Sequence, residues 1–189
     1  MTEVIETQEA PAAATNRYGV PAILLHWTSV ALIVFVGALG LCFGLIPRSS
    51  RLFWINIHAV VGLAVLILAV LRIVWRLRHG APDYPEGTPA LTRRLSGPAH
   101  WLLYALMVVL PLVGIVAYVW HARVFDFGLF KVNFGIASNK PVYEAAEEIH
   151  EFLAFSLFGL AGLHGLAALW HRFVRKDGLM ERMLPWGRA

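Results

Sequence analysis

The chain has 189 residues, of which 58% are hydrophobic and only 15% are charged. Soluble domains average roughly 45–50% apolar and about 25% charged residues, so this composition excludes both a soluble globule and a disordered chain. The single cysteine, Cys42, excludes a disulfide framework, a cysteine-rich zinc site and the CxxCH attachment of c-type haem. We therefore expect a small integral membrane protein.

The first 16 residues are acidic and polar, which predicts a short disordered tail and is the wrong flank for a cleaved signal peptide. Behind this tail, four stretches of about 20 or more residues carry no formal charge, which is the length that crosses a hydrocarbon core as a helix. They predict helices near 20–46, 52–77, 98–121 and 146–173. Residues 17–189 are thus expected to form a single all-α domain, an integral membrane four-helix bundle.

Lys and Arg residues are divided unequally between the two sets of predicted loops. With the N-terminus in the cytoplasm, eleven of them lie on the cytoplasmic side and five on the other side. By the positive-inside rule, this favours cytoplasmic N- and C-termini. The loop at 79–97 is then cytoplasmic, and the aromatic loop at 122–145 is external, where it is expected on the membrane surface. The net charge of +4 follows from this topology and requires no nucleic acid partner.

Four histidines lie inside the predicted spans, where ionisable side chains are costly and by default indicate function. His150 and His164 are fourteen residues apart on the fourth span, so they share one face and lie about 21 Å apart along the helix axis. That separation is too large for one metal ion and suits two sites, one in each leaflet. For any single histidine, a hydrogen bond to a neighbouring carbonyl is the alternative.

Depth in the membrane assigns a partner to each of these two histidines. His26 matches His164 near the cytoplasmic side, and His58 matches His150 near the external side. Two imidazoles in an apolar cavity are the axial ligands of a low-spin b-type haem. Zinc or copper would need further ligands, and no carboxylate or thiol is expected at either level. The pattern therefore predicts two haem b sites stacked across the membrane.

Other polar residues at the two membrane surfaces are candidates for binding substrates. His171 follows His164 by one heptad, and together with His100 it could bond to a quinone at the cytoplasmic mouth. Arg48, Arg51 and Lys131 could attract a small anion to the external side. The alternatives are interfacial histidines without a ligand and basic residues that contact lipid headgroups.

Four stretches of the sequence resemble the bacterial cytochrome b561 family of dihaem inner-membrane proteins. They are RYGVPAILLHW, IPRSSRLFWINIHAVVGL, AHWLLYALMVVLPLVGI and IHEFLAFSLFGLAGLHGLAALWHRFVRKDGLMERMLP. The resemblance extends from Arg17 to Pro185, and it places the family's haem ligands at His26, His58, His150 and His164. It also implies that His171 lies at the quinone end, whereas His100 is assigned by location alone.

Within the family, this short chain most resembles the superoxide oxidases. That resemblance implies oxidation of superoxide to oxygen at the periplasmic face and reduction of ubiquinone near the cytoplasmic face. One alternative is an electron-carrier cytochrome b subunit of a hydrogenase or dehydrogenase complex, which would take electrons from a periplasmic donor. Another is a metal or proton transporter, which is disfavoured because Ser156 is the only polar residue between Phe152 and Leu163.

Overall fold

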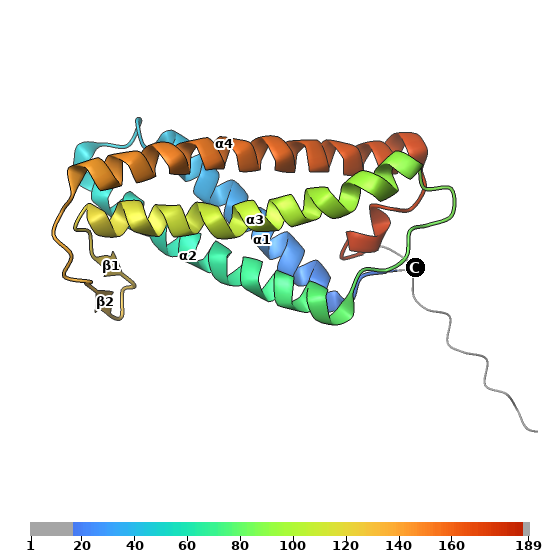
Figure 1. Cartoon of the computed structure of the whole chain (residues 1–189), viewed down its shortest axis with the longest axis horizontal. Helices are drawn as coiled ribbons and strands as arrows, with labels where there is room; N and C mark the ends of the chain where they lie inside the picture. Colours follow the sequence, from blue (N-terminus) through green and yellow to red (C-terminus); the bar gives the residue numbers. More distant parts are fainter. Residues whose placement is uncertain (1–16, 187–189) are drawn as a thin grey trace, which may run out of the picture.

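The computed structural model describes residues 17–186, so the predicted tail at 1–16 lies outside the described residues, as do residues 187–189. Four long helices run side by side along the long axis of the molecule (Figure 1): α1 (Val20–Cys42), α2 (Arg48–His79), α3 (Ala90–Trp120) and α4 (Lys140–Trp170). Each of the four is long and apolar enough to cross a membrane. The predicted membrane helices are therefore confirmed in number and order.

Four helix boundaries differ from the prediction by four residues or more, one of them the start of α2, at Arg48 rather than near residue 52. α3 begins at Ala90 rather than near residue 98, because the helix continues through Pro98. Membrane helices tolerate a proline where neighbouring groups satisfy the freed backbone, so the Gly–Pro pair at 97–98 is not a helix stop here. α4 also begins early, at Lys140, because the side chain of Asn139 accepts a hydrogen bond from the amide of Val142 and caps the helix.

α1 ends at Cys42 rather than near residue 46. Turn hydrogen bonds follow, from the amide of Leu45 to the carbonyl of Cys42 and from the amide of Ile46 to the carbonyl of Phe43. Pro47 disfavours helical conformation at the residue before it, Ile46, so the chain leaves α1 through these turns.

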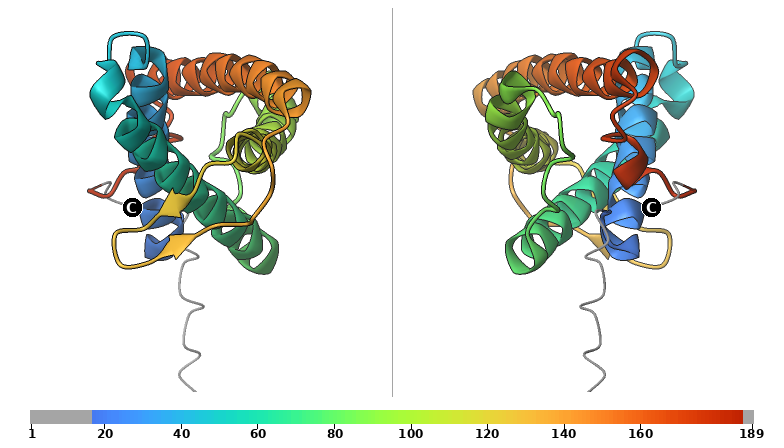
Figure 2. Two further views of the ribbon diagram at one scale, coloured as in Figure 1. Left: turned by 90° about the vertical axis from the view of Figure 1, so that its left-hand side faces the viewer. Right: turned by 90° about the vertical axis from the view of Figure 1, so that its right-hand side faces the viewer.

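The core lies in the middle of the bundle, where three helices meet. Val65 and Ala69 of α2, Met107 of α3 and Leu157 of α4 are buried together, and apolar side chains of α1 pack against them. Viewed along the bundle, α1 lies beside α2 and α3 lies beside α4 (Figure 2). α2 also packs against α3, so each helix lies next to the one that follows it in the sequence.

A small hairpin marks one end of the bundle. β1 (Phe125–Asp126) pairs in antiparallel fashion with β2 (Lys131–Val132). Asn56 of α2 anchors it, because its side-chain amide donates to the carbonyl of Asp126 at 2.7 Å and its Oδ1 accepts from the amide of Asp126 at 2.9 Å. Tyr118 of α3 also donates to this Oδ1, at 3.0 Å. We call this the hairpin end.

The two ends of the described chain meet at the opposite end of the bundle, which we call the terminal end. α4 continues there into η1 (His171–Arg175), a turn of π-helix, and then into η2 (Glu181–Met183), a turn of 3₁₀-helix. Trp27 of α1 donates from its indole nitrogen to the carbonyl of Met183 at 2.8 Å. Arg17 donates to the carbonyl of Leu184. These bonds hold the C-terminal segment against the start of α1.

Candidate functional site

Each of the four membrane helices carries two residues fourteen positions apart, one at each of two levels of the bundle. The pairs are His26 and Gly40 on α1, His58 and Arg72 on α2, His100 and Gly114 on α3, and His150 and His164 on α4. Fourteen residues advance a helix by about 21 Å and return it to within about 40° of the same face. We call Gly40, His58, Gly114 and His150 the hairpin-side level, and His26, Arg72, His100 and His164 the terminal-side level.

At the hairpin-side level, two histidine rings face each other across the bundle. The ring centres of His58 and His150 are 6.0 Å apart, and the ring planes are inclined by 67°. His150 donates from Nδ1 to the carbonyl of Leu110 at 3.0 Å, which leaves Nε2 as the nitrogen with a free lone pair. A metal ion between the rings would need two metal–nitrogen bonds of about 2 Å each. These two bonds and the radii of the two rings together match the separation of the ring centres.

Glycines leave room around these two rings. A Cβ placed on Gly40 would lie 3.4 Å from the ring of His58, and a Cβ placed on Gly114 would lie 2.9 Å from Cε1 of His150. Gly62, one turn after His58, has no heavy atom within 4 Å of the corresponding position. An apolar cavity that both histidines line extends past Gly62 to Leu157 in the core.

The residues of the hairpin-side level fit a b-type haem. Nδ1 of His58 is buried and makes no hydrogen bond of ordinary geometry among the described residues, although the backbone of Val36 lies close enough to interact with the ring. A neutral ring with a free lone pair, opposite a second such ring in an apolar cavity, is the donor set of bis-histidine haem ligation. Within residues 17–186, no three His, Cys, Asp or Glu side chains converge as a site for a metal ion.

The terminal-side level holds three histidines and an arginine. The ring centres of His100 and His164 are 5.1 Å apart. Arg72 donates from Nη2 to Nδ1 of His26 at 3.2 Å. His26 lies within electrostatic range of His100, His164 and Arg72, so all four side chains belong to one cluster. The two histidines that the sequence pairs by depth, His26 and His164, are therefore both present at this level.

His171 lies beyond this level, in the π-helical turn at the terminal end. Its side chain is buried, and it donates from Nδ1 to Oδ2 of Asp177 at 2.6 Å. Its Nε2 accepts a hydrogen bond at 3.3 Å from the hydroxyl of Thr92, the third residue of α3. The two predicted quinone residues thus have different partners, because His100 belongs to the terminal-side level and His171 to a Thr–His–Asp chain of hydrogen bonds.

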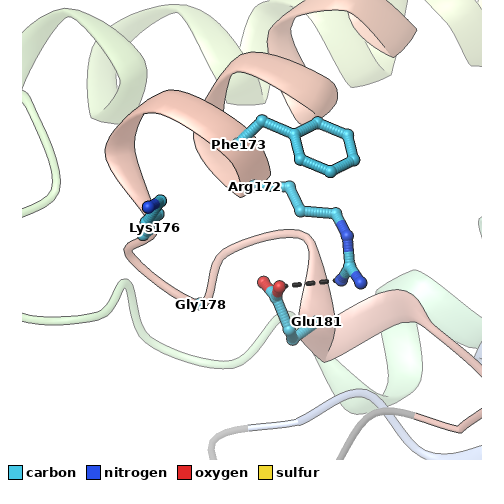
Figure 3. Close-up of a pocket in the computed structure, with 5 residues that line it drawn as sticks. All are labelled: Arg172, Phe173, Lys176, Gly178 and Glu181. Carbon is cyan, nitrogen blue, oxygen red and sulfur yellow. Dashed lines mark hydrogen bonds and ion pairs between the residues drawn. The ribbon is translucent and has the colours of Figure 1, made fainter.

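A surface pocket lies next to the hydrogen-bonded Thr92, His171 and Asp177. It is lined by Arg172, Phe173, Lys176, Gly178 and Glu181 (Figure 3). The guanidinium of Arg172 is paired with the carboxylate of Glu181 at 2.8 Å. None of the five residues belongs to either level of the bundle.

The three predicted anion-attracting residues lie at the hairpin end, on two different elements. Arg48 and Arg51 occupy the first turn of α2, and Arg51 donates to the carbonyl of Ile46 at 3.0 Å. Lys131 of β2 forms an ion pair with Asp126 of β1 at 2.9 Å. The hydrogen bond from Lys131, together with that from the amide of Gly128, lowers the pKa of Asp126 below its ordinary value. The charge of Lys131 is therefore opposed by a neighbouring carboxylate.

Arg72 and Gly114 are the residues that the sequence reasoning missed. Arg72 entered the prediction only as a positive charge in the topology count. A signal was available in the spacing, because Arg72 follows His58 by the same fourteen residues that separate His150 from His164. Gly114 follows His100 by fourteen residues in the same way.

Comparison with known proteins covers the whole described chain. A model of the prokaryotic cytochrome b561 family matches residues 17–186. The chain is 32% identical over 181 residues to a protein of Yersinia pestis named "Probable superoxide oxidase CybB", a match that covers 92% of this chain and 99% of that one. It is 27% identical to cytochrome b561 homolog 1 of Escherichia coli strain K12, over 90% of this chain and 98% of the other.

A further relative, cytochrome b562 of Cereibacter sphaeroides, is 27% identical over 86% of this chain and 91% of its own length. The four membrane helices and the family match confirm the predicted family and the multi-pass location in the bacterial inner membrane. They also agree with an electron-transport protein that carries haem. The chain belongs to the prokaryotic cytochrome b561 family.

Proposed function

We propose that this chain binds two haem b groups and moves electrons across the inner membrane, from superoxide in the periplasm to ubiquinone near the cytoplasm. The observation that carries the proposal is the pair of histidine levels, which lie about 21 Å apart on the same helix faces. The relative named as a superoxide oxidase supports superoxide as the donor. With cytoplasmic termini, the hairpin end is periplasmic and the terminal end is cytoplasmic.

In this proposal, His58 and His150 hold the iron of one haem, and His26 and His164 hold the iron of the other. Haem bound at these positions would supply one-electron chemistry, while the protein orients it and tunes its environment. The carbonyl of Leu110 fixes the tautomer of His150, as a carbonyl or carboxylate commonly does for a metal-bound histidine. Apolar residues between the levels, such as Val65 and Leu157, keep water out of the space between them.

The overall reaction balances with protons taken up at the terminal end. Two superoxide ions each lose one electron and give two molecules of oxygen, and one ubiquinone gains two electrons and two protons to give ubiquinol. We place the ubiquinone contacts at His171 and His100. Asp177 holds Nδ1 of His171, so Nε2 is the ring atom that could exchange the hydroxyl of Thr92 for a hydroxyl of the ubiquinol product, which would donate to it in the same way.

Stopped-flow mixing of superoxide with the oxidised, purified protein tests the donor. We expect the haem absorbance to show reduction within the mixing experiment and reoxidation when ubiquinone is added. Superoxide dismutase in the syringe should abolish both changes. Haems that stay oxidised in superoxide would contradict this donor, and a larger soluble partner that copurifies would then favour an electron-carrier subunit.

Removing the negative charge of Asp126 should raise the rate of reaction with superoxide. The ordinary pKa of an aspartate is already well below neutral pH, and Lys131 and the amide of Gly128 lower that of Asp126 further. Asp126→Asn therefore removes a full negative charge and leaves the charge of Lys131 unopposed. We expect the second-order rate constant to rise about two- to threefold at low salt and to return to the wild-type value near 0.5 M salt, since salt screens exposed charges.

Glu144→Gln is the comparison for this variant, because Glu144 forms an exposed ion pair with Lys140 at 3.4 Å on α4. An equal rise in both variants would show a general effect of net charge. An unchanged rate constant in Asp126→Asn would exclude Lys131 from the approach path of superoxide.

A further inference from the structure

Arg72 places a cation against the buried interior of the bundle. Its guanidinium lies 5.2 Å from the ring centre of Tyr104, and its Nη1 lies 3.7 Å from the sulfur of Met107. Tyr104 and Met107 are only 8% and 3% exposed. The third contact is the hydrogen bond to Nδ1 of His26 at 3.2 Å. The charged end of Arg72 therefore points among the helices, not toward lipid or the membrane surface.

The four membrane helices offer no carboxylate at this depth. α1, α2 and α3 contain no Asp or Glu, and the four glutamates of α4 all lie within its first twelve residues, at the hairpin end. The last of them, Glu151, is thirteen residues or about 20 Å before His164. None of the ion pairs among residues 17–186 includes Arg72. Because a charge within the membrane is costly unless it is paired, an anion bound between the helices would stabilise this site.

The hydrogen bond to His26 is incompatible with ligation through Nε2. A guanidinium only donates, so Nδ1 of His26 accepts and the proton of the neutral ring is on Nε2. An imidazole that binds iron through Nε2 carries its proton on Nδ1 instead. That nitrogen then cannot accept from Arg72, and the guanidinium must turn to another acceptor.

We propose that Arg72 pairs with a propionate of the haem held by His26 and His164, and that its charge raises the reduction potential at the terminal-side level. Haem b brings two carboxylates, and a planar guanidinium binds a carboxylate in bidentate fashion. A fixed positive charge favours the reduced state, which carries one more electron. The charge of Arg72 thus makes electron movement from the hairpin-side level to the terminal-side level more favourable. The inference rests on the proposed binding of haem at the terminal-side level.

Redox titration of the purified holoprotein tests this role with Arg72→Gln, Arg72→Lys and the control Arg78→Gln, which removes an exposed charge from the same helix. We expect Arg72→Gln to shift the reduction equilibrium of one haem by at least tenfold toward the oxidised state, or about 59 mV for one electron. The other haem should be unchanged. Arg72→Lys keeps the charge and should restore most of the potential. Arg78→Gln should leave both potentials at their wild-type values.

Two further measurements separate the possible failures. The haem count shows whether the terminal-side haem exists, so two bound haems with unchanged potentials in Arg72→Gln would overturn the role of Arg72 and leave the proposed function standing. The low-spin signals in electron paramagnetic resonance report the axial imidazoles, and they should not move if Arg72 bonds to a propionate. A change in those signals that Arg72→Lys does not reverse would instead show that Arg72 acts through His26.

If Arg72→Gln loses one haem outright, Arg72→Lys decides the question. A normal potential and haem count in Arg72→Lys would support the charge pairing, and loss of the haem in both variants would contradict it.

Discussion

Replacing His58 by alanine is expected to reduce the haem content of the purified protein from two haem b groups per chain to one. The two levels lie about 21 Å apart, so loss of a ligand at the hairpin-side level leaves the terminal-side cluster around His26 and His164 intact. The change also removes the ring that faces His150 at 6.0 Å. A pyridine haemochrome assay against protein concentration gives the count, and the reduced-minus-oxidised spectrum shows which component is lost.

The complementary variants make this a test of two independent sites. His164→Ala should also leave one haem, with a spectrum different from that of His58→Ala, and the double variant should have none. His121→Ala is the matched control, because this ring lies at the hairpin end and stacks on Tyr143 at 4.3 Å without belonging to either level. Loss of both haems in each single variant would contradict independent sites, and no haem in the wild type would contradict the whole proposal.

Much of the fold was predictable because each membrane helix must satisfy its own backbone hydrogen bonds over a length set by the lipid. Charge-free runs therefore located all four helices. Their ends were less predictable, because local turn chemistry competes there with helix continuation. The Gly–Pro pair at 97–98 is typical of a helix stop, yet α3 continues through it, while Asn139 begins α4 earlier than the apolar run indicates.

The histidine levels were predictable for a geometric reason. A spacing of fourteen residues fixes both face and depth on a straight helix, and depth alone brings His58 opposite His150. Contacts that depend on the direction of a side chain could not be predicted from the sequence. The ion pair of Lys131 with Asp126 depends on the register of a two-residue hairpin, and the bond from Arg72 to His26 depends on how α1 and α2 cross.

Substituting Gly114 should remove the hairpin-side haem without disturbing the fold. A methyl carbon at this position would lie 2.9 Å from Cε1 of His150, closer than the roughly 3.5–4.0 Å of an ordinary carbon contact. The ring cannot retreat freely, because its Nδ1 is bonded to the carbonyl of Leu110. Disturbing the support of a metal-bound histidine typically costs about 10–100-fold in affinity, so we expect a loss of that size in Gly114→Ala and complete loss in Gly114→Leu.

Gly97 provides the matched control, since it lies in the same helix and has no heavy atom within 4 Å of the added Cβ. Alanine favours a helix over glycine by about 1 kcal/mol, so neither Gly114→Ala nor Gly97→Ala should weaken α3 itself. The haem count and the optical spectrum of Gly97→Ala and Gly97→Leu should match the wild type, while the Gly114 series loses the same spectral component as His58→Ala. If Gly114→Leu retains two haems with an unchanged spectrum, the close approach of α3 to His150 has no part in holding the haem. A loss confined to the Gly114 series would show that haem binding at this level needs two things: the space left by the glycine on α3 and the imidazole on α4.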